Sequence, residues 1–128
     1  MRASLDIETA LYNRLTADAY QASAHALPGT LGSSLPLVHV VRTGGYTTDM
    51  VIEENNVDFD VYAGTEADAM EEASSLCGWV RDLAGTSLDT PCYYSEVITL
   101  PYNNPDPRHP NIARATFKAL IFTRVKGV

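Results

Sequence analysis

Two aspartates, Asp58 and Asp60, form the best candidate pair of catalytic or metal-binding carboxylates in the sequence. They lie two residues apart in the alternating stretch VDFDVYA, and alternate side chains of a strand point to the same face. Two carboxylates held side by side suit a divalent cation or a general acid and base. A third ligand is missing, because Glu53 and Glu54 lie across an expected turn. The interpretation that we favour is the polar face of an amphipathic strand, one that lines a channel.

The other residue types that carry chemistry show no recognisable spacing. His25, His39 and His109 are far apart, and no CxxC accompanies them, so a zinc site is not indicated. Gly44-Gly45 belongs to neither a GxGxxG nor a phosphate-binding loop, and there is no GxSxG. We therefore predict that the protein is not an enzyme and has no catalytic residue, metal or cofactor.

The cysteines and tyrosines also favour a structural role. Cys77 falls near the apolar face of an expected helix and Cys92 precedes an expected strand, so both are predicted to be buried free thiols. Tyr93, Tyr94 and Tyr102 are of the type that stacks on nucleic-acid bases. Because acidic residues surround them, we interpret them as packing or interface residues.

The charge of the chain is negative overall but unevenly distributed. The net charge is −7, with five basic residues and one acidic residue in 106–128, so this segment carries +4 and residues 1–105 carry −11. A negative protein does not grip nucleic acid broadly. Surfaces of both signs suit self-association, and the alternative is charge scattered over the surface without a function.

The hydrophobic pattern predicts one α+β domain spanning residues 1–128. We expect a mixed or antiparallel sheet of about four to five strands, with two main helices packed on one side. Thr65 and Gly85 supply the capping residues of the second helix. No apolar run approaches the ~20 residues that a membrane helix needs. The expected helices span 5–22 and 65–85, and the expected strands span 35–45, 48–53, 57–63, 92–100 and 113–125.

A hairpin over about 42–56 is expected to project from the sheet. Its Tyr46, Met50 and Ile52 are too apolar to be left to water, so a neighbouring subunit is the natural cover. In the last strand, Leu120 and Phe122 share a face with basic residues, which indicates a contact surface rather than a solvated one.

A loop over about 101–111, PYNNPDPRHPN, joins the last two strands. Connections of this length usually have a function, and prolines stiffen a chain toward an extended arm that loses little entropy on docking. A tolerated surface insertion is the alternative. The expected contact residues of this loop are Tyr102, Asn103, Asn104, Asp106, Arg108 and His109.

A leading helix, the strand LPLVHV, the strand VDFDVYAGT and a helix with alanines at 69 and 73 follow one another along the chain. In this order they resemble the tail-terminator family of long-tailed bacteriophages. The resemblance covers nearly the whole chain in element order and is specific at residue level over 57–73. The family pattern VDVYA.T is matched by Val57, Asp58, Val61, Tyr62, Ala63 and Thr65, with Phe59-Asp60 as a local variation.

The resemblance implies a structural virion protein, made in the host cytoplasm, that forms a homo-oligomeric ring, usually of six copies. Such a ring caps the tail tube and joins it to the head–tail connector or stopper protein, with no membrane partner. DNA passes through the lumen without specific binding, which an acidic lining favours by repulsion. The residues expected to provide that lining are Glu53, Glu54, Asp58 and Asp60.

Three alternatives remain open from the sequence. The first is another phage ring protein, such as a tail-tube or head-completion subunit, which would polymerise or close differently. The second is a small metal-dependent hydrolase that uses Asp58 and Asp60. The third is a ligand-binding module with a pocket near Trp79 and the tyrosines.

Overall fold

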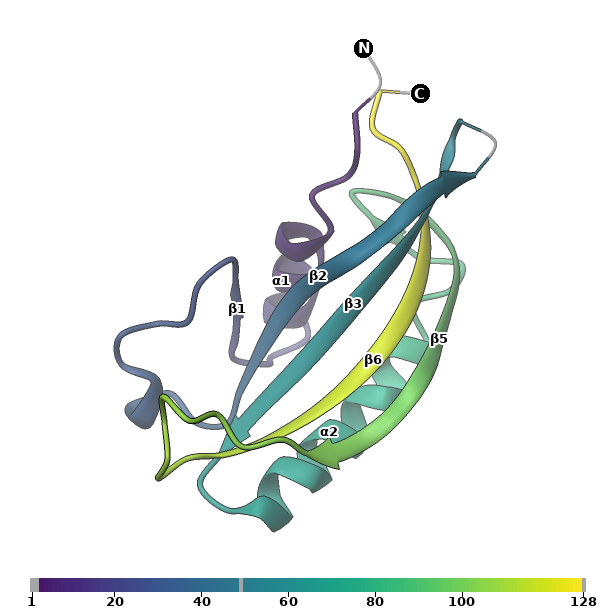
Figure 1. Cartoon of the computed structure of the whole chain (residues 1–128). Coiled ribbons are helices and arrows are strands. Elements are labelled where there is room, and N and C mark those ends of the chain that lie inside the picture. The colour runs from purple at the N-terminus through teal and green to yellow at the C-terminus, as the bar shows by residue number, and fades with distance from the viewer. Residues whose placement is uncertain (1–2, 49, 128) are drawn as a thin grey trace.

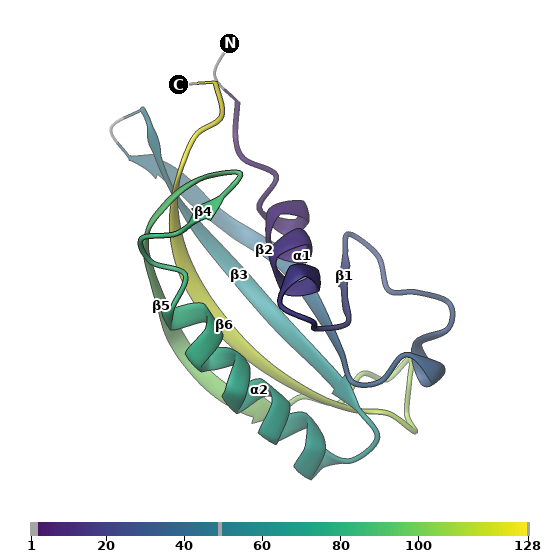
Figure 2. The same ribbon diagram turned by 180° about the vertical axis from the view of Figure 1, so that it is seen from behind.

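A mixed, six-stranded sheet carries both helices on one of its faces (Figures 1 and 2). The computed structural model describes residues 3–48 and 50–127. The strand order is β1-β2-β3-β6-β5-β4, in which β1 is parallel to β2 and the other pairs are antiparallel. The elements are α1 (Ile7–Ala17), β1 (Ala22–Ala24), a 3-10 turn (Leu31–Ser33), β2 (Leu37–Thr48), β3 (Ile52–Ala63), α2 (Glu66–Arg81), β4 (Ser87–Leu88), β5 (Thr90–Asn103) and β6 (Ala113–Arg124).

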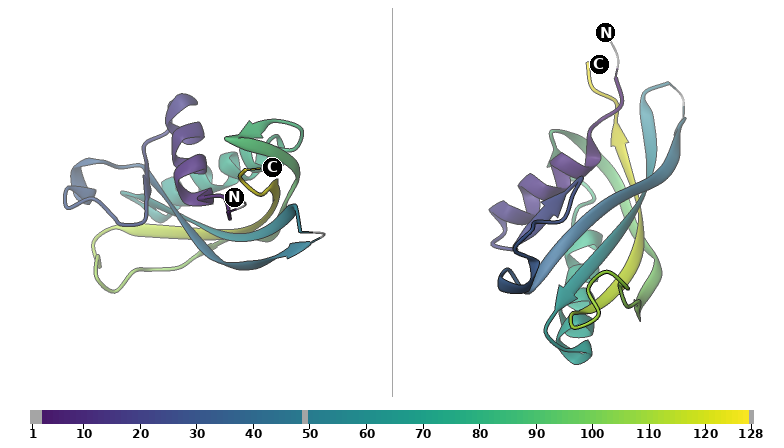
Figure 3. Two further views of the ribbon diagram at one scale, coloured as in Figure 1. Left: turned by 90° about the horizontal axis from the view of Figure 1, so that it is seen from above. Right: turned by 60° about the vertical axis from the view of Figure 1, so that its left-hand side comes forward.

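The expected fold class, a single α+β domain with two helices on one side of the sheet, is confirmed (Figure 3). The predicted Thr65 N-cap of the second helix is confirmed, because its hydroxyl accepts the Asp68 N–H at 3.1 Å. The predicted C-terminal cap is wrong: the helix ends at Arg81 with Asp82 as its C-cap, and Gly85, with a φ of 84°, lies in the turn that follows. The first helix ends at Ala17 rather than at 22, because Ala19 adopts a positive φ of 69° and the chain turns back into β1.

The expected bend at Asn55-Asn56 is wrong, because both residues belong to the continuous strand β3. The buried Asn55 amide donates to the Ile121 carbonyl oxygen at 2.9 Å and accepts from Arg42. These contacts fix the asparagine in an extended backbone. The reversal lies instead at the tip of the hairpin, where the Val51 N–H donates to the Thr48 carbonyl oxygen.

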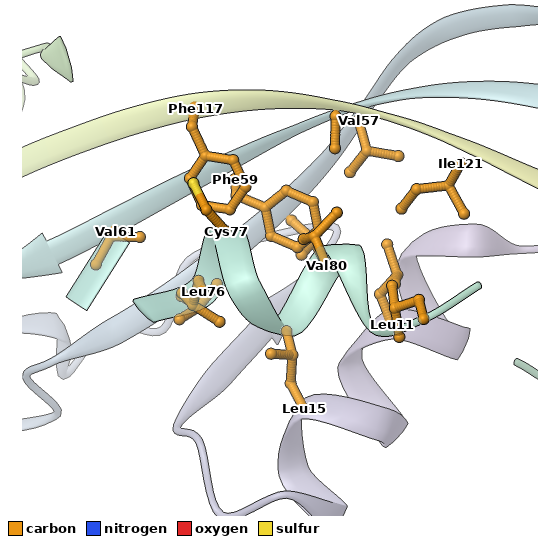
Figure 4. Packing of buried hydrophobic residues seen from close by; sticks show 14 of the residues in the cluster. Leu11, Leu15, Val57, Phe59, Val61, Leu76, Cys77, Val80, Phe117 and Ile121 are labelled. Atoms are coloured by element: carbon orange, nitrogen blue, oxygen red, sulfur yellow. The ribbon is translucent and has the colours of Figure 1, made fainter. Parts of the chain in front are cut away.

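The main core lies between the helices and the sheet (Figure 4). Phe59 of β3 stacks on Phe117 of β6 at a centroid distance of 4.9 Å, and both rings are fully buried. The indole of Trp79 meets Phe59 edge to face and donates to the Asp18 carboxylate. Alternation therefore puts Val57, Phe59 and Val61 of β3 toward the helices and Asp58 and Asp60 on the opposite, helix-free face.

A second, smaller cluster lies on the helix-free face at one end of the sheet. Leu31, Leu37 and Tyr62 are buried there, with Ile112 packed against them. The connection between β5 and β6 covers this cluster together with the segment that precedes β2. This end of the helix-free face is therefore closed by the chain itself.

We predict that Phe59→Ala lowers the free energy of unfolding by about 3–5 kcal/mol, since it opens a cavity in the stack that joins the two central strands. Urea titration followed by circular dichroism measures the change. The matched control is Leu100→Ala on β5, where the side chain is exposed and the expected change is within about 0.5 kcal/mol. Equal losses in the two variants would contradict this description of the core.

Candidate assembly surface

The helix-free face displays a row of carboxylates on β3 beside a row of basic and apolar side chains on β6. Asp58 lies opposite Lys118, and the Lys118 ammonium donates to both carboxylate oxygens at 3.0 and 3.1 Å. The hydrogen bond that Lys118 donates to Asp58 is the main cause that raises the pKa of Lys118. Asp60 lies opposite Thr116 and accepts its hydroxyl at 2.8 Å.

These pairings bear on the hydrolase alternative. Asp58 is paired with Lys118 through both oxygens, and Asp60 accepts the Thr116 hydroxyl through Oδ1, so each carboxylate has a partner on the neighbouring strand. Within residues 3–48 and 50–127, no three His, Cys, Asp or Glu side chains come together in a way that could hold a metal ion. The arrangement is that of cross-strand pairs on a polar sheet face.

The structure separates the four carboxylates that were expected to line a lumen. Glu54, Asp58 and Asp60 share the helix-free face, where Glu54 accepts the Thr48 hydroxyl at 2.7 Å. Glu53 points the other way, is 4 % exposed, and accepts the Ser4 hydroxyl and the Leu5 N–H. The assignment of Glu53 to a lumen is therefore wrong, because strand alternation places it among the segments that precede α1.

The segment expected to be an extended arm is instead folded against the sheet. Residues 101–103 continue β5, where Tyr102 pairs with Thr116. Residues 104–112 then form tight turns, with the His109 N–H donating to the Asp106 carbonyl oxygen. Pro101 thus lies within β5, and Pro105, Pro107 and Pro110 lie in the turns that follow it rather than in an extended arm.

Asp106 is the buried anchor of this connection and not an accessible contact residue. It is 2 % exposed and accepts the Tyr62 hydroxyl at 3.0 Å and the Arg108 N–H at 3.0 Å. The Arg114 guanidinium lies 3.6 Å away. Desolvation opposes ionisation of Asp106, but the hydrogen bonds from Arg108 and Tyr62 outweigh it and lower the pKa to about 2.

The other expected contact residues of this connection have different surroundings. The Asn103 amide donates to Glu66 at the start of α2, and the Asn104 amide donates to Thr116. His109 meets the Tyr62 ring edge to face. The Arg108 side chain is 75 % exposed.

Exposed apolar side chains concentrate on β5. Of the eight large hydrophobic residues that are exposed in the described chain, five lie on this one strand. Ile98 and Leu100 were not predicted to be contact residues, because the sequence SEVITL is typical of a buried strand. The five are Tyr93, Tyr94, Ile98, Leu100 and Tyr102.

The expected contact residues of the hairpin and the last strand lie close to this strand or at the tip of the sheet. Tyr46 is 66 % exposed and Met50 is 73 % exposed, at the end where both termini lie (Figure 1). Ile52 is half-buried opposite Arg124 of β6. On β6, Leu120 and Phe122 are half-buried, and the Phe122 ring packs edge to face on Tyr94 at 5.5 Å.

A serine–histidine contact on the helix-free face was not predicted from the sequence. The Ser23 hydroxyl and His39 Nδ1 are 2.8 Å apart, and burial is the main cause that lowers the pKa of His39. Asp60 is the cross-strand neighbour of His39, but its recorded hydrogen bond is to Thr116. The contact ties β1 to β2 and, among the described residues, lacks the third group that orients a catalytic base.

No protein-family model matches the chain, and no curated protein matches it as a relative. Among the described residues, no helix is both long and apolar enough to cross a membrane.

We predict that Asp106→Ala lowers the free energy of unfolding at pH 7 by about 1–3 kcal/mol, because Tyr62 and Arg114 lose a buried acceptor. The control Asp58→Ala removes a partly exposed ion pair and is expected to cost about 1 kcal/mol or less. Urea titration of both variants measures the difference. A larger loss in the control would contradict the buried role of Asp106.

The same carboxylate predicts a pH dependence of stability. Its folded-state pKa of about 2 lies below that of an ordinary aspartate, so its contribution is present above about pH 4 and is lost as the pH falls toward 2. The difference in unfolding free energy between wild type and Asp106→Ala should therefore shrink between pH 5 and about pH 2.5. A difference that stays constant over this range would rule out the ionised, anchored carboxylate.

Proposed function

We propose that the chain is a structural ring subunit of a bacteriophage neck or tail, which caps the tail tube and joins it to the head connector. The observation that carries the proposal is the concentration of exposed apolar side chains on β5, next to the half-buried Leu120 and Phe122. A lone domain rarely leaves so many large apolar side chains in water on one strand, whereas an interface covers them.

The distribution of charge supports the same proposal. The outer side of the helix layer is acidic, with Glu66, Asp68 and Glu71 exposed on α2. On the helix-free face, Asp58 and Asp106 are instead paired with Lys118, Arg108 and Arg114. Two faces of unlike charge give a subunit distinct surfaces for neighbours above and below it.

The passage of DNA is a further part of the proposal. A lumen lined by the helix-free face would present Glu54 and the neutralised pair of Asp58 and Lys118. A lumen lined by the helices would present the acidic outer side of α2. Neither lining offers the row of free basic groups by which proteins hold the phosphate backbone, so DNA would pass without specific binding.

A second candidate within the same class is a tail-tube subunit. The exposed edge of β5 favours it equally, since an interface that repeats without closing builds a tube or filament. The two candidates differ in the size of the oligomer that they form. A closed ring stops growing at one size, whereas a polymer of tube subunits grows longer as the protein concentration rises.

Reconstitution with purified tail tubes tests the proposed function. Negative-stain electron microscopy should show the protein as a ring at one end of each tube, and capped tubes should no longer lengthen when tube subunit is added. Tubes that lengthen unchanged, with no protein at their ends, would contradict the proposal.

We predict that the double variant Ile98→Lys and Leu100→Lys weakens self-association at least tenfold, because it places charge in the apolar patch of β5 without entering the core. Sedimentation velocity over a concentration series measures the effect, and circular dichroism checks the fold. The matched control is Tyr12→Lys on α1, an exposed apolar residue away from β5. Equal weakening by the control would show that β5 is not the contact.

A further inference from the structure

In the part of the chain that the structure describes, two stretches of strand edge have no neighbouring strand. β1 pairs with β2 only at residues 38–40, and the Arg42 N–H is taken by the Glu8 carboxylate. On the other side, the segment 85–88 pairs with β5 only as far as Cys92. Among the described residues, no strand therefore covers the outer edge of β2 over 43–48 or that of β5 over 93–103. Such an edge presents unpaired N–H and carbonyl groups that can template the addition of another strand.

The two open stretches lie at the same level of the sheet. Cross-strand register carries one row from Tyr46 through Glu54 and Phe122 to Tyr94. The next row runs from Gly45 through Asn55 and Ile121 to Ser95. The row after it runs from Gly44 through Asn56 and Leu120 to Glu96. Copies related by rotation about an axis along the strands would therefore bring residues 44–48 beside residues 94–97.

Strand direction is also compatible with this contact. The four long strands β2, β3, β6 and β5 alternate in direction, so β2 and β5 run antiparallel to each other. If a copy is placed beside another in the same orientation, β5 of the first meets β2 of the second as an antiparallel pair. The alternation then continues across the seam, and each copy uses both of its open edges.

We propose that the edge of β2 at residues 44–48 adds to the edge of β5 at residues 94–97 of a second copy of this chain, head to tail. This inference deepens the proposed ring function and rests on it. The partner is thus a second copy of the chain, and the contact is strand addition through the backbone with apolar side chains on its flanks.

The glycines of β2 fit such an approach. Gly45 has a φ of 136°, and a Cβ there would collide with the Glu54 carbonyl oxygen, so the fold itself requires this glycine. Gly44 has a φ of 143°, yet a Cβ there would meet open space. Glycine within a strand often marks a place where another backbone comes close. Residues 43–48 carry no charge or proline that would protect an edge from pairing.

The exposed area agrees with the size that an interface needs. At about 200 Å² for a large apolar side chain, the exposed fractions of the five β5 residues amount to roughly 500 Å². Tyr46 and Met50 add roughly 300 Å² on the hairpin by the same estimate. A stable interface buries about 800 Å² on each partner, so β5 supplies more than half of one side.

The distribution of charged residues and of β-bulges also favours strand pairing between residues 44–48 and residues 94–97. Between 93 and 103 the only charged residue is Glu96, and between 41 and 48 it is Arg42, so no like charges meet at the seam. The register of β5 shifts on either side of residues 94–97, which leaves this short stretch regularly paired between bulges. Bulges bend an edge away from a partner, so the regular stretch is the place where a strand can add.

Cross-linking of mixed single-cysteine variants tests the proposal. Tyr46→Cys and Glu96→Cys are prepared separately, mixed, and treated with a short bis-maleimide in the presence and absence of purified tail tubes. The native Cys77 and Cys92 are buried, and wild-type protein serves as the reagent control. The position control mixes Tyr12→Cys with Glu96→Cys, because Tyr12 lies on α1.

The expected result is a cross-linked dimer in the mixture at least tenfold above that in either variant alone or in the position control. If Glu96→Cys alone cross-links as strongly as the mixture, β5 pairs with itself about a two-fold axis and the proposal is overturned. If assemblies form without this cross-link, the seam lies elsewhere, while the ring function stands. If the protein stays monomeric with and without tubes, both proposals fail.

Discussion

The stacking of Phe59 on Phe117 is the contact on which the rest of the structure depends. It fixes the register of the two central strands and presents a flat apolar surface on which α2 and Trp79 pack. Because strand side chains alternate, the same register places the pairs of Asp58 with Lys118 and of Asp60 with Thr116 on the opposite face. The core therefore determines the composition of the surface that is left for function.

That surface has a closed half and an open half. At one end, Asp106 draws Tyr62 and Arg114 together and folds the β5–β6 connection over the sheet. At the other end and along the edge, β5 and the tip of the hairpin leave aromatic and aliphatic side chains in water. A rigid, self-covered end beside an uncovered edge suits a subunit that meets its neighbours through defined strands rather than through flexible arms.

Much of the fold could be predicted from the sequence, because the periodicity of apolar residues is strong in α2 and in β3 and β6. The continuity of β3 through Asn55 could not, since it depends on an amide that bonds residues 66 positions away. The burial of Glu53 and Asp106 likewise depends on partners distant in sequence. Of the surface, Tyr46 and Met50 were expected to be exposed. Ile98 and Leu100 have the residue types of a buried strand, and their exposure follows only from the position of β5 beside the two-residue β4.

Native mass spectrometry of the purified protein over a concentration series tests the central claim, a closed homo-oligomeric ring, most directly. We predict one saturating species of about six copies of the 13.9 kDa chain, formed in free solution or at the end of tail tubes. A series of ever larger species would indicate an open polymer instead. A monomer that persists at every concentration and ignores tail tubes would contradict the account.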